Sequence, residues 1–139
     1  MMSNDIKIKE ASKKLEKYSV RSYNSRCKFY FEGIEVKNKN VIDIGAGQGA
    51  ISIWTALMGA NYVLGLEPDL AGGKYGRFKQ FSKLVKDLNL EKTINTSDSL
   101  LQDLNLKDMP VDGFDIAVLV AVINHLNEES VKGDCYIVS

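Results

Sequence analysis

Glycines 45, 47 and 49 follow an apolar segment, residues 41–44, and this order of residue types could bind a ligand. Glycine lets the chain turn tightly, so that backbone N–H groups and the start of a following helix can approach a ligand that a Cβ would exclude. Glu67 stands 18 residues after Gly49 at the end of a second apolar segment, where a carboxylate can accept hydrogen bonds from ribose hydroxyls. Together these residues predict a site for a nucleoside-containing cofactor.

The glycine pattern alone does not select one cofactor. Gly45, Gly47 and Ala50 also fit the dinucleotide fingerprint G-x-G-x-x-G/A, which would indicate NAD or FAD. The acid inside the apolar segment, Asp43, and the third glycine, Gly49, favour a different cofactor.

The sequence resembles the class I S-adenosylmethionine-dependent methyltransferases, whose first motif is an acid followed by G-x-G-x-G, here Asp43 to Gly49. Glu67 in LGLEPD matches the ribose-binding acid of the second motif, and Asp98 in TSDSL matches the acid of the third motif. The segment FDIAVLVAVINHL matches the fourth motif, except that Ala117 stands where the pattern has Val. The four motifs occur in the family's order and cover roughly residues 38 to 139.

The resemblance implies a role for each matched residue. The backbone of the glycine segment would hold the methionine and ribose parts of S-adenosylmethionine, and Asp43 would reach the methionine amino group directly or through water. Glu67 would bind the ribose, and Asp98 would contact the adenine amino group. The structural alternatives are that Asp43 caps a helix or braces a loop and that Asp98 starts a turn. The expected cofactor-binding set comprises Asp43, Gly45, Ala46, Gly47, Gly49, Glu67, Pro68, Asp98, Ser99 and Val120.

The elements that must position these residues alternate between strand and helix. Apolar segments predict strands at 41–44, 62–66, 94–96 and 114–122. Helical spacing predicts helices at 5–18, 26–33 and 49–58, and a further helix that Asp69 caps. This order indicates an α/β fold, a Rossmann-like doubly wound parallel sheet flanked by helices. The resemblance implies a seven-stranded sheet of order 3-2-1-4-5-7-6, relative to which this chain is incomplete.

Length and composition fit one domain over residues 1–139, with 45% hydrophobic and 26% charged residues. We expect an N-terminal helical cap over 1–39 and a cofactor-binding methyltransferase core over 40–139. The cap holds 10 Lys and Arg residues against 5 Asp and Glu residues. It could form a lid over the substrate or attract an acidic substrate, but a solvated helix face packed on the core is the favoured interpretation.

The apolar runs are far shorter than the roughly 20 residues that cross a bilayer, and the N-terminus lacks the apolar segment of a signal peptide. We therefore expect a cytoplasmic protein with no membrane partner. The two cysteines, Cys27 and Cys135, lie far apart, without a second Cys or His at metal-ligand spacing. This arrangement predicts free thiols and no metal site.

The methyl acceptor is harder to infer, because the sulfonium already carries a good leaving group and the protein mainly aligns a nucleophile and excludes water. The segment after residue 120 lacks the motifs of DNA base methyltransferases, and Glu128 and Glu129 lack the spacing of the paired glutamates of arginine methyltransferases. The resemblance favours the branch that acts on small molecules, with RNA or protein acceptors left open. His125, the only histidine, is a catalytic candidate, although in the family this position usually shapes a loop.

The resemblance stops before the last part of the family fold, so we interpret the chain as a C-terminally truncated methyltransferase. The crossover at 127–132 is shorter than a parallel connection normally needs, and an unpaired strand at 136–138 would leave an edge for self-association. Two alternatives therefore stay open. The first is a non-catalytic or partner-completed methyltransferase-like binding module, and the second is a NAD- or FAD-binding protein.

Overall fold

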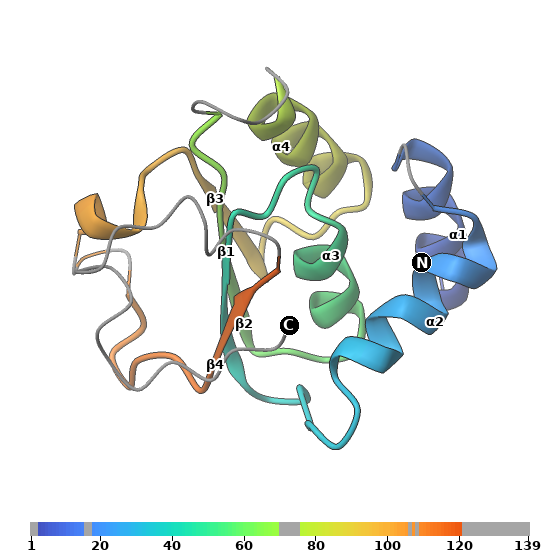
Figure 1. The fold of residues 1–139 in the computed structure, drawn as a ribbon, viewed down its shortest axis with the longest axis horizontal. Helices are drawn as coiled ribbons and strands as arrows, with labels where there is room; N and C mark the ends of the chain where they lie inside the picture. Colours follow the sequence, from blue (N-terminus) through green and yellow to red (C-terminus); the bar gives the residue numbers. More distant parts are fainter. Residues whose placement is uncertain (1–2, 16–17, 70–75, 106, 108, 121–139) are drawn as a thin grey trace.

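The computed structural model describes residues 3–15, 18–69, 76–105, 107 and 109–120, and Figure 1 shows its α-helices to one side of a single sheet. The helices are α1 (Asn4–Lys14), α2 (Val20–Tyr30), α3 (Ala50–Leu57) and α4 (Arg77–Asp87). The strands are β1 (Asn40–Ile44), β2 (Tyr62–Leu66), β3 (Ile94–Ser97) and β4 (Ile116–Leu119). A short 3-10 helix, η1 (Leu101–Asp103), lies between the last two strands.

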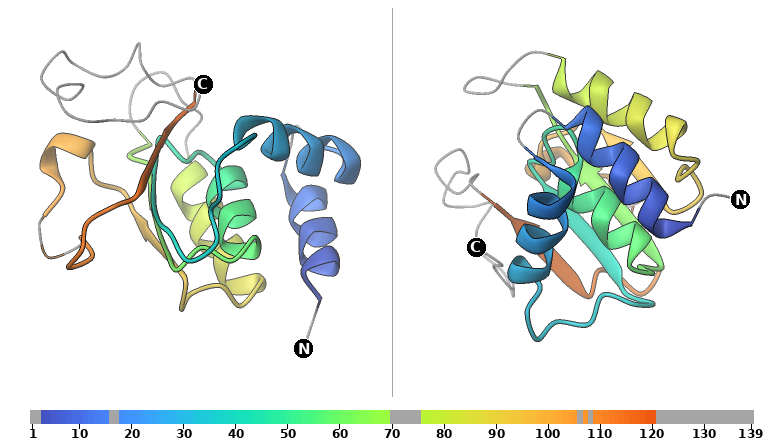
Figure 2. Two further views of the ribbon diagram at one scale, coloured as in Figure 1. Left: turned by 90° about the horizontal axis from the view of Figure 1, so that it is seen from below. Right: turned by 90° about the vertical axis from the view of Figure 1, so that its right-hand side faces the viewer.

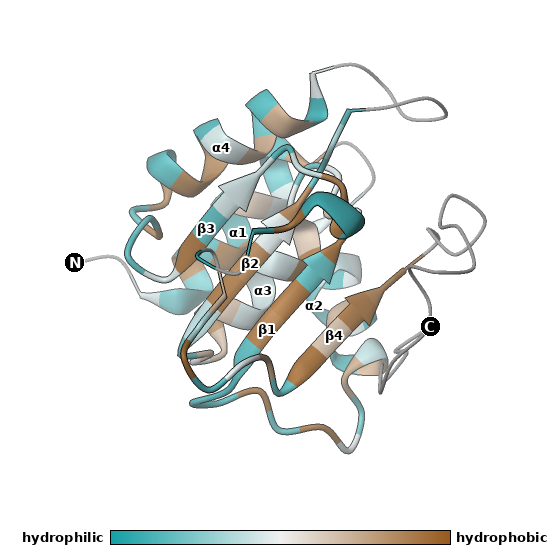
Figure 3. Ribbon diagram, turned by 90° about the vertical axis from the view of Figure 1, so that its left-hand side faces the viewer, coloured by the Kyte–Doolittle hydropathy of each residue, from teal (hydrophilic) through white to brown (hydrophobic). Residues whose placement is uncertain are grey.

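The four strands form one parallel sheet in the order β3-β2-β1-β4. Strand β1 is paired on both sides, and its register places Asp43 opposite Gly65 of β2 and Val118 of β4. This sheet confirms the predicted Rossmann-like α/β fold, and its order equals the first four strands that the resemblance implies. Because the strands are parallel, their carboxyl ends meet at one edge of the sheet, as the arrowheads in Figure 3 show.

The two faces of the sheet are covered differently. Helices α3 and α4 pack on one face, and α1 and α2 pack outside α3, an arrangement visible in Figures 1 and 2. Beneath the opposite face lies a smaller cluster of buried side chains, which comprises Ile42, Ile44, Leu64, Leu66 and Leu119. Leu101, Leu104 and Phe114, from the segment between β3 and β4, pack against this cluster.

Helix α2 is joined tightly to α3. Tyr23 and Cys27 of α2 are buried in the same hydrophobic cluster as Trp54 of α3. The ring of Phe31 stacks on Trp54 with 5.4 Å between centroids, and Trp54 Nε1 donates a hydrogen bond to Asn24 Oδ1 at 3.0 Å. The first helices therefore contribute to the core, while the division into a cap and a cofactor-binding core stays a prediction.

Two helix starts differ from the predicted ones. Helix α2 begins at Val20 rather than at 26, because Ser19 and Ser22 form a capping box at its start. Helix α4 begins at Arg77, well after Asp69, yet Asp69 still caps it. Asp69 Oδ1 accepts the backbone N–H groups of Arg77 at 3.0 Å and of Phe78 at 3.3 Å. Asp69 thus acts across a connection rather than as the residue next to the helix.

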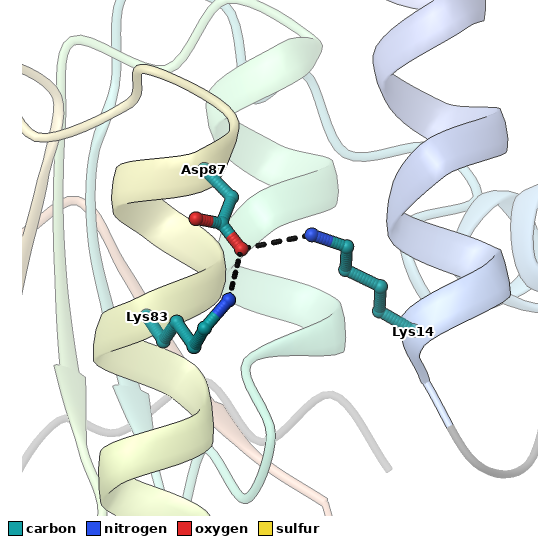
Figure 4. Close-up of polar contacts among 3 residues, drawn as sticks. All are labelled: Lys14, Lys83 and Asp87. Atoms are coloured by element: carbon teal, nitrogen blue, oxygen red, sulfur yellow. Dashed lines mark hydrogen bonds and ion pairs between the residues drawn. The ribbon is translucent and has the colours of Figure 1, made fainter.

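A shared ion pair joins α1 to α4 at the surface. Asp87 Oδ2 accepts from Lys14 Nζ of α1 and from Lys83 Nζ of α4, both at 2.8 Å (Figure 4). The hydrogen bonds from these two lysines lower the pKa of Asp87 to about 2. Exposed ion pairs contribute little to stability, so this contact mainly orients α1 against α4. No helix among the described residues has the length and apolarity needed to cross a membrane.

Candidate cofactor-binding site

The predicted site residues lie at or just after the carboxyl ends of the strands, and these ends meet at one edge of the sheet (Figure 3). The glycine turn, residues 45–49, follows β1, Glu67 and Pro68 follow β2, Asp98 and Ser99 follow β3, and Val120 follows β4. Backbone hydrogen bonds tie neighbouring strand ends. Ala46 N–H donates to Leu66 O at 2.8 Å, and Glu67 N–H donates to Ser97 O at 2.9 Å. The fold therefore brings motifs that are distant in the sequence to one edge.

The glycine turn depends on backbone conformations that side chains disfavour. The φ angles of Gly45, Gly47 and Gly49 are 72°, 59° and 90°, all in the left-handed region. Gly47 N–H donates to Glu67 Oε2 at 2.7 Å. Among the described residues, a β-carbon on Gly47 would meet a single neighbour, Nη1 of Arg77, at 3.2 Å. The turn is thus open at Gly47, apart from one flexible side chain.

Gly49 has a packing role that the sequence analysis missed. A β-carbon on Gly49 would overlap the ring of Phe81 from α4. On the other side of this ring, a β-carbon on Gly65 of β2 would stand 2.5 Å from Phe81 Cζ and 2.9 Å from Ser52 Oγ. The Phe81 ring is completely buried, so it fills the space that the two glycines leave. Gly49 therefore serves helix packing, whereas Gly47 offers the open surface.

Asp43 lies buried near the end of β1, with 2% of its surface exposed. Its Oδ2 accepts two hydrogen bonds from Ser52 of α3, from the backbone N–H at 3.1 Å and from the hydroxyl at 2.6 Å. Burial raises the pKa of Asp43 to about 6; the Ser52 hydrogen bonds partly offset this rise, and the charge of Glu67 adds to it. Asp43 thus braces α3 against β1, and its contact with a methionine amino group stays a prediction.

Glu67 links β2 to the glycine turn and to the start of α4. Besides the bond to Gly47, its Oε1 accepts the Asp69 N–H at 3.3 Å. Asp69 has a left-handed φ of 53° and caps α4 at Arg77. Arg77, which the sequence analysis did not select, in turn places its guanidinium beside Gly47. An acid and a cation therefore flank the same glycine.

The predicted site residues after β3 and β4 differ in their exposure. Asp98 is exposed, and Ser99 is half-buried, with its N–H donating to Ser97 Oγ at 3.2 Å. Val120 is half-buried against the main hydrophobic cluster. These three residues lie at the same edge of the sheet as Glu67. The contact of Asp98 with adenine and the parts of Ser99 and Val120 in cofactor binding stay predictions.

The fold is shared with solved methyltransferases, although no family model matches the chain and no curated protein matches it in sequence. Protein arginine methyltransferase 10 of Arabidopsis thaliana matches 69% of this chain with a TM-score of 0.52 and 25% identity. The Trypanosoma brucei PRMT1 enzyme–prozyme complex with AdoHcy matches 70% with a TM-score of 0.54 and 23% identity. A Pyrococcus horikoshii protein, provisionally assigned as an RNA methyltransferase, matches 76% with a TM-score of 0.53 and 17% identity.

The described residues have the fold of the S-adenosylmethionine-dependent methyltransferases. This methyltransferase fold is present here as four parallel strands with their helices. The chain spans 24% and 28% of the lengths of the first two neighbours and 48% of the third. These neighbours are named for arginine or RNA methylation, so they do not support the predicted small-molecule acceptor.

Several predicted features of the methyltransferase fold lie outside the described residues, namely His125, Glu128, Glu129, Cys135 and the strand at 136–138. Cys27 is a free thiol, and its burial raises its pKa to about 12. Within the described ranges, no group of three or more His, Cys, Asp or Glu side chains is arranged to hold a metal ion.

Proposed function

We propose that this chain binds S-adenosylmethionine at its glycine turn and acts as a methyltransferase. The observation that carries the proposal is the meeting of Gly47 N–H and Glu67 Oε2, 2.7 Å apart, where β1 and β2 end. Ligands of open α/β sheets bind outside these strand ends, where a carboxylate can accept hydrogen bonds from ribose hydroxyls.

The residues present fit a nucleoside. A carboxylate offers about four lone-pair sites, so Glu67 retains capacity after accepting the N–H groups of Gly47 and Asp69. Glu67 is only half-buried and therefore reachable. Ribose hydroxyls would use that capacity, and the exposed carboxylate of Asp98, just after β3, would accept a hydrogen bond from the adenine amino group.

Asp43, near the end of β1, fits the cationic end of the same ligand. A positive charge close to a carboxylate favours its ionised form. Because burial raises the pKa of Asp43 to about 6, an ammonium group beside it would stabilise a charge that the protein alone stabilises poorly. Asp43 would thus hold the methionine amino group while its bonds to Ser52 keep α3 in place.

S-adenosylmethionine, when bound, supplies a sulfonium methyl group that an acceptor removes by in-line displacement. The residues of this chain would hold the cofactor, align the acceptor and exclude water. The first acceptor class to test is a small molecule, as the sequence predicts. RNA and arginine-containing peptides belong beside it, because the neighbours are named for those substrates.

The proposal is tested by isothermal titration of the chain with S-adenosylmethionine, S-adenosylhomocysteine and NADH. We expect micromolar binding of the first two and no heat from NADH. Gly47→Val should abolish binding, while Gly33→Val, which has a comparable φ of 76° and no neighbour within 4 Å of its β-carbon, should not. Binding of NADH alone would support the dinucleotide alternative, and a folded protein that binds none of the three would support a non-catalytic module.

A further inference from the structure

Arg77 is a cation placed at a turn that is otherwise lined by acids. It is the first residue of α4 and is half-buried. Its Nη1 lies 3.2 Å from the position that a Gly47 β-carbon would take, and Glu67 binds the N–H of the same glycine. The guanidinium therefore lies beside Gly47, where the turn is otherwise open among the described residues.

Within the part of the chain that the structure describes, no acid forms an ion pair with this guanidinium. The ion pairs there join Lys14 and Lys83 to Asp87. Asp69 directs its Oδ1 to the backbone N–H groups of Arg77 and Phe78 instead. A half-buried charge is stabilised by a partner of opposite charge, so this position suits an anionic group of a ligand.

We infer that Arg77 is a specificity-determining residue that binds the carboxylate at the amino-acid end of S-adenosylmethionine. This inference rests on the proposed function, in which the turn holds the methionine part. An amino-acid end is a zwitterion and needs an anion for its ammonium and a cation for its carboxylate. Asp43, near the end of β1, and Arg77, beside Gly47, would supply these two charges from different elements. Arginine suits the carboxylate because its planar fork can bind both oxygens.

Two ligands distinguish binding of the carboxylate by Arg77 from a contribution of Arg77 to binding the nucleoside. S-adenosylhomocysteine and 5′-methylthioadenosine share the thioether-linked nucleoside, but only the former carries the amino-acid carboxylate. We expect Arg77→Gln to weaken S-adenosylhomocysteine about 10- to 100-fold in isothermal titration, the size of one lost charge-assisted interaction. Binding of 5′-methylthioadenosine should change less than about twofold. Arg77→Lys should recover part of the loss, because it restores the charge without the fork.

Lys79→Gln is the matched control, because Lys79 is an exposed cation on the same helix and its removal changes the net charge equally. It should leave both affinities unchanged, and circular dichroism should show that all variants are folded. Unchanged binding of S-adenosylhomocysteine by Arg77→Gln, or equal weakening of both ligands, would overturn the inference. If the wild-type chain instead binds NADH and Arg77→Gln loses it, the guanidinium serves a pyrophosphate and the inference is also overturned. A wild-type chain that binds neither nucleoside ligand would contradict the proposed function itself, and the two failures are thus distinct.

Discussion

The two halves of the candidate site differ in how firmly their residues are held. At the ends of β1 and β2, the side chains of Asp43 and Glu67 accept hydrogen bonds from Ser52 and Gly47, and the Phe81 ring is fully buried beside the turn. At the ends of β3 and β4, Asp98 is exposed and Ser99 makes a local bond to Ser97. The side chains of the β1–β2 half are therefore held by contacts within the protein, whereas in the β3–β4 half the carboxylate of Asp98 is exposed to solvent.

The largest loss of stability should come from adding a side chain to a glycine that packs against the Phe81 ring. Gly65→Ala should destabilise the fold by about 3 kcal/mol, because its β-carbon would meet Phe81 and Ser52 in a packed core. Gly49→Ala should cost more, since it adds a left-handed φ of 90° to the same clash. Urea denaturation measures both.

Gly33→Ala separates backbone strain from steric overlap, because Gly33 has a φ of 76° and its β-carbon would have no neighbour within 4 Å. This substitution should lower the free energy of unfolding by only about 1 kcal/mol. Adding Phe81→Leu should partly relieve Gly65→Ala and leave the cost of Gly33→Ala unchanged. A Gly65→Ala protein as stable as the wild type would show that the β1–β2 half is less tightly packed than the structure indicates.

The next largest effect concerns the dependence of stability on pH and comes from Asp43, the buried acid of the β1–β2 half. A folded-state pKa of about 6 for Asp43, above its usual value of 3.8, means that the folded protein binds more protons than the unfolded chain between these pH values. Stability should therefore fall as pH rises from about 4 to 6, by up to about 3 kcal/mol, and then stay level with respect to this group. Asp43→Asn should remove this slope in urea denaturation from pH 4 to 7. A slope that persists in the variant would assign the titration to another group.

Glu67→Ala should weaken S-adenosylhomocysteine by about 1 to 3 kcal/mol, the value of charge-assisted hydrogen bonds. The variant also leaves Gly47 N–H without its partner at 2.7 Å, so a moderate loss of stability should accompany the loss of affinity. Glu91→Ala removes an exposed acid outside the four motifs and is the control. Wild-type affinity in Glu67→Ala would remove Glu67 from the site.

The smallest effect on ligand affinity should come from the β3–β4 half. Asp98→Ala should weaken S-adenosylhomocysteine by less than about 1 kcal/mol, because an exposed acceptor exchanges a bond with water for a bond with adenine. Its melting temperature should equal that of the wild type, as Asp98 is exposed. A clear drop in melting temperature would mean that this half also braces the fold, and the contrast between the halves would fail.

The four strands, their parallel direction and the place of Glu67 could be predicted from the residues, because short apolar segments that alternate with helical ones form parallel sheets. The order of the strands in the sheet followed from the resemblance to the methyltransferases. The roles of Gly49 and Gly65 could not, because Phe81 lies 32 residues after Gly49 and only the packed α4 brings it there. The roles of Ser52 and Arg77 could not be predicted either, because neither residue belongs to a motif and only the folded chain brings them to Asp43 and Gly47. The start of α2 was missed because Ser22 replaces the Glu or Gln expected in a capping box.

A two-dimensional ¹H–¹⁵N NMR titration of the chain with S-adenosylhomocysteine tests most directly whether a nucleoside binds at the glycine turn. We expect saturable shifts for the amides of Gly45, Gly47, Glu67 and Ser99, and none for Gly33 and Gly59, whose turns lie outside the site. Saturation without change at Gly47 and Glu67, or no saturable change at any amide, would contradict a nucleoside site at the glycine turn.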